Sequence, residues 1–321
     1  MLLVFSPKPL MPVDFHECWF LTGPTAAGKT AIGLELAERL NAEVISLDSM
    51  SIYREMDIGT AKPTAAEQAQ APHHLIDICD PTVEFSVSQY YDAAEQAVEE
   101  IRARGREVLF VGGTPLYLKS LLRGIFEGPP ADWDFRNEVM QEVEQVGTQA
   151  LHERLQMVDP LAAAKLHPND VRRIVRALEV HRATGQPISH LQEQFDEGRS
   201  ADECKVFVLG HPRAILHQRI DDRVDRMIAD GWVEEVCDLL DIYGELSRTA
   251  SQAVGYREMI EHVNGKQPLG KTVEAIKART HQFARRQETW FRSLSECRSI
   301  DLTDDDTPTS VTEHILATQV T

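Results

Sequence analysis

The stretch Gly23-Pro24-Thr25-Ala26-Ala27-Gly28-Lys29-Thr30 decides the fold of this chain. It matches the pattern G-x-x-x-x-G-K-[ST] in full, follows a short apolar run at 18–22, and opens a segment with apolar residues at helical spacing at 29–40. Its glycines let the backbone wrap closely around phosphate oxygens, while Lys29 adds a positive charge and Thr30 can hold Mg²⁺. A strand, this loop and a helix in that order predict a phosphate-binding site.

The rest of the chain continues this alternation of strand and helix. We expect strands at 43–47, 107–111 and 205–209, a helix capped by Ser86 or Ser88 and ended by Gly105, and helices at 114–123 and from 213 to about 293. Such alternation predicts an α/β fold, a P-loop NTPase-like parallel sheet with helices on both faces.

Between the two halves of this pattern the sequence is helical throughout, which predicts an all-helical insertion domain. We expect an N-terminal extension at 1–17, a catalytic core at 18–127 and 203–295, the insertion at 128–202, and a poorly ordered acidic tail at 296–321. The first 17 residues lack the features of a secretory signal, and no apolar run is long enough to span a bilayer. We therefore expect a cytoplasmic protein that needs no membrane.

The net charge of −18 over 321 residues argues at first against a nucleic-acid partner, because phosphate contacts need a basic surface. The charge is uneven, however. The tail at 301–321 has five acidic residues and no Lys or Arg, whereas 165–176 and 272–293 are locally basic. The mean charge therefore decides little. The five cysteines are isolated, so we expect reduced, mostly buried thiols and no zinc site or disulfide framework.

A complete P-loop identifies a phosphate binder but not the phosphate compound. In nucleotide-hydrolysing P-loop proteins a strand ends in a metal-binding Asp, whereas here the strand at 108–111 ends in Gly112-Gly113-Thr114. No Asn-Lys-x-Asp guanine signature is present either. These departures disfavour a motor-type ATPase or a GTPase, and they leave a small-molecule kinase or a related group transferase.

Asp48 and Thr114 both follow predicted strands, at the sheet edge where open α/β folds bind ligands. Asp48 there could serve as a general base or metal partner, or it could simply cap the turn that follows. Thr114 could contact a ligand or act as a helix N-cap, and the two roles are compatible. Position alone leaves these alternatives open.

Several segments together resemble the bacterial tRNA dimethylallyltransferases (the IPP transferase family) over roughly 20–292. They are Gly23–Thr30, Asp48-Ser49-Met50-Ser51-Ile52-Tyr53, Met56-Asp57-Ile58-Gly59-Thr60-Ala61-Lys62-Pro63, Pro72-His73-His74-Leu75-Ile76-Asp77, Val111-Gly112-Gly113-Thr114-Pro115-Leu116-Tyr117, His167-Pro168-Asn169-Asp170, Arg176-Ala177-Leu178-Glu179 and Ala253-Val254-Gly255-Tyr256-Arg257.

The resemblance implies a reaction: dimethylallyl diphosphate donates its allyl group to N6 of the adenosine 3′ of the anticodon, and pyrophosphate leaves. Such enzymes are customarily labelled ATP- and nucleotide-binding, but the same loop, Gly23 to Thr30, would hold the donor's pyrophosphate. Asp48 would be the base at N6, Thr114 would contact the pyrophosphate and the reacting region, and Arg223 would clamp the pyrophosphate. Mg²⁺, held by Thr30, would be the cofactor.

The resemblance also implies the contacts with the tRNA anticodon stem-loop. These would come from Asp48, Ser49, Met50, Ser51, Thr114, Arg136, Arg172, Arg173, Ile174, Val175, Arg176, Gln252, Ala253, Val254, Gly255, Tyr256 and Arg257. The spacing of the arginines in 172–176 places at least two on one helix face. The alternative interpretation is that these arginines lie on a solvated helix face and form ion pairs such as Arg176–Glu179. For the helix at 283–294 we expect Phe283, Trp290 and Leu294 to be core contacts.

Two residues depart from the family pattern. Ala27 stands where Ser is common in the P-loop, and this change should be mild because backbone groups do most of the cradling. Ser51 stands where many members have Gln, and it is too short to copy a contact made by that longer side chain. The zinc finger of eukaryotic relatives is absent from the sequence.

Two other functions compete with the transferase. A small-molecule kinase would explain the P-loop and the sheet, but not a helical insertion with clustered arginines or the Gly-Gly-Thr strand end. A non-catalytic RNA-binding module would not need Asp48 and Thr114 beside a complete phosphate loop. For the oligomeric state we assume a monomer.

Overall fold

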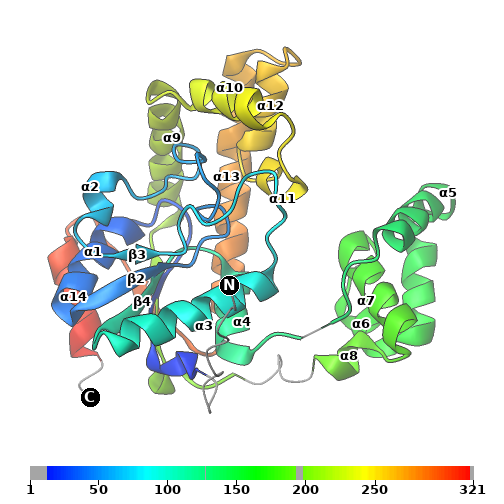
Figure 1. The fold of residues 1–321 in the computed structure, drawn as a ribbon, viewed down its shortest axis with the longest axis horizontal. Helices are drawn as coiled ribbons and strands as arrows, with labels where there is room; N and C mark the ends of the chain where they lie inside the picture. Colours follow the sequence, from blue (N-terminus) through cyan, green and yellow to red (C-terminus); the bar gives the residue numbers. More distant parts are fainter. Residues whose placement is uncertain (1–12, 127, 193–197, 319–321) are drawn as a thin grey trace, which may run out of the picture. The chain divides into compact units, whose positions relative to one another are not determined.

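The computed structural model describes residues 13–126, 128–192 and 198–318. The chain divides into two compact units, which Figure 1 draws as a ribbon. The larger unit consists of Met1–Leu122 and Gly198–Thr321, and the smaller unit spans Arg123–Glu197. Each boundary of the smaller unit lies five residues before the corresponding boundary predicted for the insertion, 128 and 202.

The larger unit is built on one parallel sheet of six strands in the order β3-β2-β4-β1-β5-β6. The strands are β1 (Trp19–Thr22), β2 (Ala42–Ser46), β3 (His73–His74), β4 (Glu107–Val111), β5 (Lys205–Gly210) and β6 (Cys297–Asp301). Phe20 of β1 lies opposite Phe110 of β4 on one side and Val206 of β5 on the other. The strand that enters the P-loop is therefore inside the sheet, and the carboxyl ends of its neighbours meet beside it.

Helices pack on both faces of the sheet, which confirms the predicted fold class. Alternate strand residues point to opposite faces, so Phe20 and Phe110 join a core with α3 and α4, while Leu21 and Leu109 join a core with α1 and α14. The helices of this unit are η1 (Phe15–Glu17), α1 (Lys29–Leu40), α2 (Ala65–Gln68), α3 (Val87–Ala103), α4 (Pro115–Arg123), η3 (Ala201–Glu203), α9 (Arg213–Ala229), α10 (Trp232–Tyr243), α11 (Arg248–Ser251), α12 (Tyr256–Val263), α13 (Leu269–Arg292) and α14 (Pro308–Ala317).

The helix boundaries follow local chemistry. Ser86, rather than Ser88, caps α3: its hydroxyl accepts the N–H of Gln89, whose side chain reaches back to the cap. The same helix ends just before Gly105, which takes a φ of 70°. These caps are readable from sequence because the bonds that define them span only three residues.

The prediction that 296–321 form a poorly ordered acidic tail is wrong. This segment forms β6, which pairs with β5, and α14, which packs against α1. Ile300, Leu302, Val311 and Ile315 are all buried there. The acidic residues of this segment suggested disorder, but the burial of these four apolar residues stabilises the sheet edge. At the other end, Phe15 lies in the core, so the described part of the predicted extension (13–17) is folded as well, and 1–12 lie outside the described residues.

The smaller unit is all-helical, as predicted. It contains α5 (Trp133–Val158), which is interrupted at Gly147, α6 (Pro160–Lys165), α7 (Val171–Thr184) and α8 (Ile188–Leu191) around its own apolar core. The buried Asp159 links three of these helices: its carboxylate accepts the N–H of Ala162 and the N–H and hydroxyl of Ser189.

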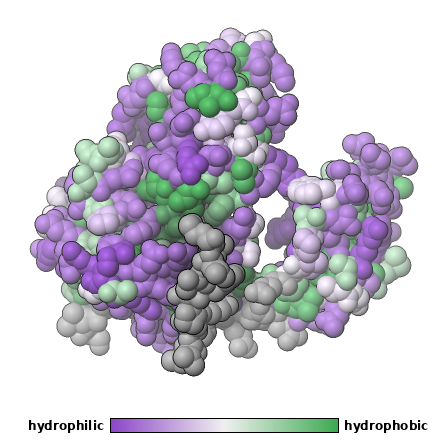
Figure 2. All heavy atoms as spheres, in the orientation of Figure 1, coloured by the Kyte–Doolittle hydropathy of each residue, from purple (hydrophilic) through white to green (hydrophobic). Residues whose placement is uncertain are grey.

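Hydrophilic residues cover most of the face drawn in Figure 2. No helix in the described part of the chain is both long and apolar enough to cross a membrane. The cysteines are all free, and Cys18, Cys79 and Cys204 are buried, which confirms the prediction of unpaired thiols.

Candidate active site

The P-loop runs from the end of β1 to the start of α1, with the geometry that its glycines predict. At Gly23, which has φ 141°, a Cβ would come within 2.5 Å of the Leu209 carbonyl oxygen, so no other residue fits without a shift. Gly28 has φ 90° and opens α1. Ala27, where the family often has Ser, is buried in the core beneath the loop. The loop is therefore shaped by its backbone, and its backbone N–H groups are the groups it offers to an anion.

Lys29 is folded back onto its own loop. Its Nζ donates to the carbonyl oxygens of Gly23 (3.0 Å) and Pro24 (2.7 Å). Burial, followed by the charge of Arg223, lowers the pKa of Lys29 to about 7, while Asp48 acts in the opposite direction. A negatively charged ligand would reverse this shift, because it stabilises the protonated amine.

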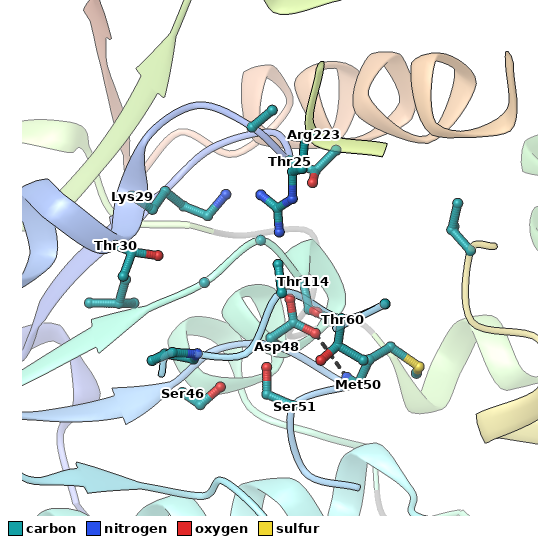
Figure 3. Close-up of a pocket in the computed structure, with 18 of the residues that line it drawn as sticks. Thr25, Lys29, Thr30, Ser46, Asp48, Met50, Ser51, Thr60, Thr114 and Arg223 are labelled. Carbon is teal, nitrogen blue, oxygen red and sulfur yellow. Dashed lines mark hydrogen bonds between the residues drawn. The ribbon is translucent and has the colours of Figure 1, made fainter. Parts of the chain in front are cut away.

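Arg223, on α9, points its guanidinium into the same space as the Lys29 ammonium (Figure 3). Burial lowers the pKa of Arg223, and the charge of Asp48 partly offsets that effect. Within 13–318, leaving out 127 and 193–197, Arg223 makes no hydrogen bond or ion pair. Two half-buried cations thus face one cavity without a carboxylate bonded to either, an arrangement that favours a multiply charged anion.

Asp48 caps a turn with one carboxylate oxygen and lines the cavity with the other. Its Oδ1 accepts the backbone N–H of Met50 (2.8 Å) and so caps the turn after β2. Its Oδ2 has no hydrogen-bond partner among the described residues and lines the cavity. The turn bond fixes the carboxylate, and the second oxygen is left to accept a proton from a ligand.

Thr114 lies beside Asp48 and joins the two loops at the sheet edge. Its hydroxyl oxygen accepts the backbone N–H of Ser49 (3.0 Å) and its backbone N–H donates to the Leu47 carbonyl (3.0 Å). The hydroxyl proton makes only a long bond of 3.4 Å, to Ser49 Oγ. The hydroxyl could therefore donate a hydrogen bond to a ligand oxygen while losing only this long bond.

These groups line one cavity of about 390 Å³. Two helices form its other wall with residues at helical spacing: Ile220, Arg223, Val224 and Met227 of α9, and Ile276, Thr280, Phe283 and Gln287 of α13. The cavity is charged where Lys29 and Arg223 face it, and the two helices also line it with the apolar side chains of Ile220, Val224, Met227, Ile276 and Phe283. An anion bound at the loop would have room for a short hydrocarbon group beside it.

The tRNA-contacting residues predicted at 49–51 and 252–257 differ in burial. Ser49, Met50, Ser51, Ala253 and Val254 line the same cavity as Asp48. Gly255 and Tyr256 are buried behind them, whereas Gln252 and Arg257 are exposed. The short Ser51 side chain is 5% exposed and lies beside Asp48 in Figure 3.

The fit of Mg²⁺ rests on one side chain. Among the residues that the structure describes, no three His, Cys, Asp or Glu side chains gather as a metal site would. The Thr30 hydroxyl faces the cavity (Figure 3). This suits Mg²⁺, which usually keeps several waters and takes substrate phosphate oxygens with only one or two protein ligands.

The arginines of the helical unit are arranged differently, because most of them have acidic partners. Glu179 of α7 is 2% exposed, and its carboxylate accepts two hydrogen bonds of 2.8 Å from Arg136 and another from Arg176. Burial alone would raise the pKa of Glu179, but these bonds outweigh it and the pKa is lowered. The ion pair Arg176–Glu179, the alternative that the spacing left open, is therefore present.

The remaining residues of 172–176 also have defined surroundings. Arg173 is exposed and pairs with Asp170, and Arg172 is exposed. Ile174 and Val175 are 0% and 4% exposed, so their side chains belong to the core of the unit and are not available to a partner. The resemblance made them candidates as part of the stretch 172–176, but the helix turns their side chains inward.

Sequence reasoning assigned no role to two features of the pocket. The loop at 56–63 contributes Gly59 and Thr60 to its wall, and Glu235 of α10 accepts the N–H groups of Asp57, Ile58 and Gly59. Gln287 of α13 bonds to two loops of the site. The helical spacing of 276, 280, 283 and 287 was a readable signal that Gln287 shares the face of Phe283.

The prediction that Trp290 is a core contact is wrong, since its side chain is 40% exposed. Leu294 is buried, as predicted, and Phe283 is half-buried against the cavity. Trp290 lies on α13 with the exposed residues Arg285 and Arg286. The face of α13 that carries Phe283 is turned toward the pocket, so Trp290 lies on the exposed side of the helix.

The sequence is similar to one family of known proteins. The family model for IPP transferase matches residues 51–294. A tRNA dimethylallyltransferase of Rhodopirellula baltica is 50% identical over 93% of this chain and 92% of its own length, and one of Thermotoga petrophila is 44% identical over 88% of this chain and 92% of its own length.

Solved structures give the same result. A tRNA isopentenylpyrophosphate transferase of Bacillus halodurans superposes with a TM-score of 0.69 and 39% identity, covering 95% of this chain and 97% of that one. A eukaryotic dimethylallyltransferase described as acting on tRNA superposes with a TM-score of 0.70 and 28% identity, covering 89% of this chain and 74% of its own.

Proposed function

The chain belongs to the IPP transferase family, and we infer that it is a tRNA dimethylallyltransferase, a prenyl-transferring enzyme. The kinase alternative is set aside by this membership. The observation in the structure that carries the inference is one cavity in which Lys29 and Arg223 face the carboxylate of Asp48. We propose the following roles for its residues.

The donor is dimethylallyl diphosphate, with its diphosphate at the P-loop. The backbone N–H groups of 27–30 cradle the phosphate oxygens, and Lys29 leaves its two carbonyl partners to meet them. Arg223 neutralises the charge that grows on the bridging oxygen as the bond to carbon breaks. The allyl chain lies along the apolar side chains with which α9 and α13 line the cavity.

The acceptor is N6 of the adenosine 3′ of the anticodon. Its nitrogen forms a bond to the first carbon of the allyl group while the carbon–oxygen bond breaks, and pyrophosphate leaves with the electron pair. The proton lost by N6 passes to Oδ2 of Asp48, the oxygen that the turn bond leaves open. General-base assistance of this kind typically contributes about 10²–10⁴-fold.

Thr30 would hold Mg²⁺ together with the diphosphate oxygens. The ion would supply charge neutralisation for the leaving group. The hydroxyl of Thr114, which is bound only weakly to Ser49, would turn toward the diphosphate.

The tRNA is an anticodon stem-loop with its target base extruded, because a stacked base cannot reach Asp48. We place the loop bases against Ser49, Met50, Ser51, Ala253 and Val254, which line the cavity. Exposed arginines of the helical unit, Arg172 and Arg173, contact phosphates. We further propose that the enzyme acts as a monomer in the cytoplasm.

The test measures transfer of labelled dimethylallyl diphosphate to unmodified tRNA with Mg²⁺ present. Asp48→Asn is the informative variant, because its amide oxygen still accepts the Met50 N–H while the side chain can no longer take a proton. We expect wild-type protein to label tRNA, and Asp48→Asn to lose about 10³-fold in kcat with nearly unchanged tRNA affinity.

Asp92→Asn, a matched change on the surface of α3, serves as the control and should retain full activity. Equal labelling by Asp48→Asn would remove Asp48 from the role of base but keep the enzyme class. The absence of any label on tRNA from wild-type protein would reject the proposed reaction.

A further inference from the structure

The two loops that enclose the diphosphate site are joined by one side chain from α13. Gln287 is 3% exposed, and its carboxamide spans from the P-loop to the loop after β4. Its Oε1 accepts the backbone N–H of Thr25 (2.9 Å), and its Nε2 donates to the carbonyl oxygen of Gly113 (2.5 Å).

The chemistry of these two bonds requires glutamine. The Thr25 N–H can only donate and the Gly113 oxygen can only accept, so the residue between them needs one acceptor and one donor at a fixed separation. A glutamate would satisfy Thr25 but direct a second oxygen at the Gly113 carbonyl. A methionine of similar length would satisfy neither, which leaves two buried polar groups unpaired.

The fit is also tight on the other side. A Cβ on Gly113 would come within 2.7 Å of Gln287 Nε2, 3.2 Å of the Gly23 carbonyl oxygen and 3.5 Å of Lys29 Nζ. Gly113 precedes Thr114, and Thr25 lies four residues before Lys29. The carboxamide therefore bridges two loops that carry groups of the site.

We propose that Gln287 is a positioning residue that fixes the gap between the P-loop and the Gly112–Thr114 loop, and so sets the affinity for the diphosphate. This inference rests on the proposed function, since it assumes that the gap holds the donor's diphosphate. It also restricts the cradle: because the Thr25 N–H is bonded to Gln287, the phosphate oxygens are held by the N–H groups nearer the start of α1.

The same helix places this link beside the rest of the site. Phe283 and Thr280, one and two turns before Gln287, line the cavity, and α13 packs against α9, which carries Arg223. A change at Gln287 should consequently alter donor binding and catalysis while leaving the outer surface of α13 in place.

The test uses inorganic pyrophosphate with Mg²⁺ as a probe of the cradle, and measures its Kd by calorimetry on the full-length protein. The variants are Gln287→Met, Gln287→Glu and, from the other side of the bond, Gly113→Ala. Gln282→Met is the matched control, because it makes the same change on the exposed face of α13.

We expect each site variant to bind pyrophosphate about 10-fold or more weakly, and to lose up to about 10²-fold in kcat/KM for dimethylallyl diphosphate, because small displacements of bound groups have effects of that size. The KM for tRNA and all values for Gln282→Met should stay within about twofold of wild type. The double variant Gln287→Met/Gly113→Ala should lose less pyrophosphate affinity than the sum of the two single losses, because both changes break the same hydrogen bond.

A purely structural role predicts something else: a lower melting temperature with unchanged pyrophosphate Kd in the folded variants, and that result overturns the proposal. If Gln287→Met does not fold, Gln287→Glu and Gly113→Ala decide in the same way. Label transfer by wild-type protein is scored separately. If the variants lose pyrophosphate binding but wild-type protein transfers no label, the proposed function is rejected and the positioning role of Gln287 stands. If wild-type protein transfers label but the variants bind pyrophosphate normally, the positioning role is rejected and the proposed function stands.

Discussion

The catalytic pocket and the helical unit both gather basic side chains, but they treat them in opposite ways. In the pocket, among the residues that the structure describes, Arg223 has no acidic partner bonded to it and Lys29 donates only to carbonyl oxygens of its own loop. In the helical unit, Arg136 and Arg176 converge on the buried carboxylate of Glu179. A cation in a cavity that has no acidic partner is available to bind an anionic ligand, whereas a cation bonded to a buried carboxylate neutralises a charge within the fold.

The strongest test of this contrast removes the pocket cation. Lys29→Met should lower kcat/KM for dimethylallyl diphosphate by about 10³-fold, because a charged donor to the leaving group is lost. Its thermal stability should equal or exceed that of wild type, since the half-buried amine that is removed has no acidic partner among the described residues. A large loss of stability with normal donor kinetics would contradict the contrast.

The corresponding change in the helical unit is Glu179→Ala. We expect it to lower the free energy of unfolding of that unit by about 3 kcal/mol, because Arg136 and Arg176 lose the carboxylate that neutralises them. Urea denaturation followed by the fluorescence of Trp133, together with the pyrophosphate Kd, measures both regions. The pyrophosphate Kd should stay unchanged, and a parallel loss in both regions would show that they are not separable.

A pH titration sharpens the comparison within the pocket. Since the pKa of Lys29 in the unliganded protein is about 7, the amine is increasingly neutral above that pH and must take up a proton to bind a diphosphate. The affinity for dimethylallyl diphosphate should therefore fall as pH rises above 7, by up to about tenfold per unit. Lys29→Arg, whose guanidinium stays charged, should show a flatter profile, and equal slopes for the two proteins would exclude Lys29 as the titrating group.

The smallest expected effect is at Arg173, on the exposed face of α7. Its pair with Asp170 is on the surface, so Arg173→Ala should change the free energy of unfolding by no more than about 0.5 kcal/mol. If the side chain contacts a tRNA phosphate, tRNA affinity should fall about threefold at low salt and the salt dependence should become shallower. Asp170→Ala, which frees the arginine, should have the opposite effect on affinity.

Much of the core could be predicted from the sequence because its signals are local. The P-loop glycines, the helix at 29–40 and the strand at 107–111 depend on residues that are neighbours along the chain. Asp48 and Thr114 could be placed at one edge because parallel strands end together, and the structure puts both in one cavity. The function followed from the resemblance that these motifs carry together, which the comparisons confirm.

The tertiary structure alone decided which side chains act on one another. Gln287 is 262 residues from Thr25 and 174 from Gly113, and no pattern within α13 shows that its amide meets both. In the same way, only packing shows that Ile174 is buried beside exposed arginines, that Trp290 faces outward, and that 297–317 completes the sheet. Sequence periodicity fixes the face of a helix, whereas the partner of that face is set by contacts between segments far apart in the chain.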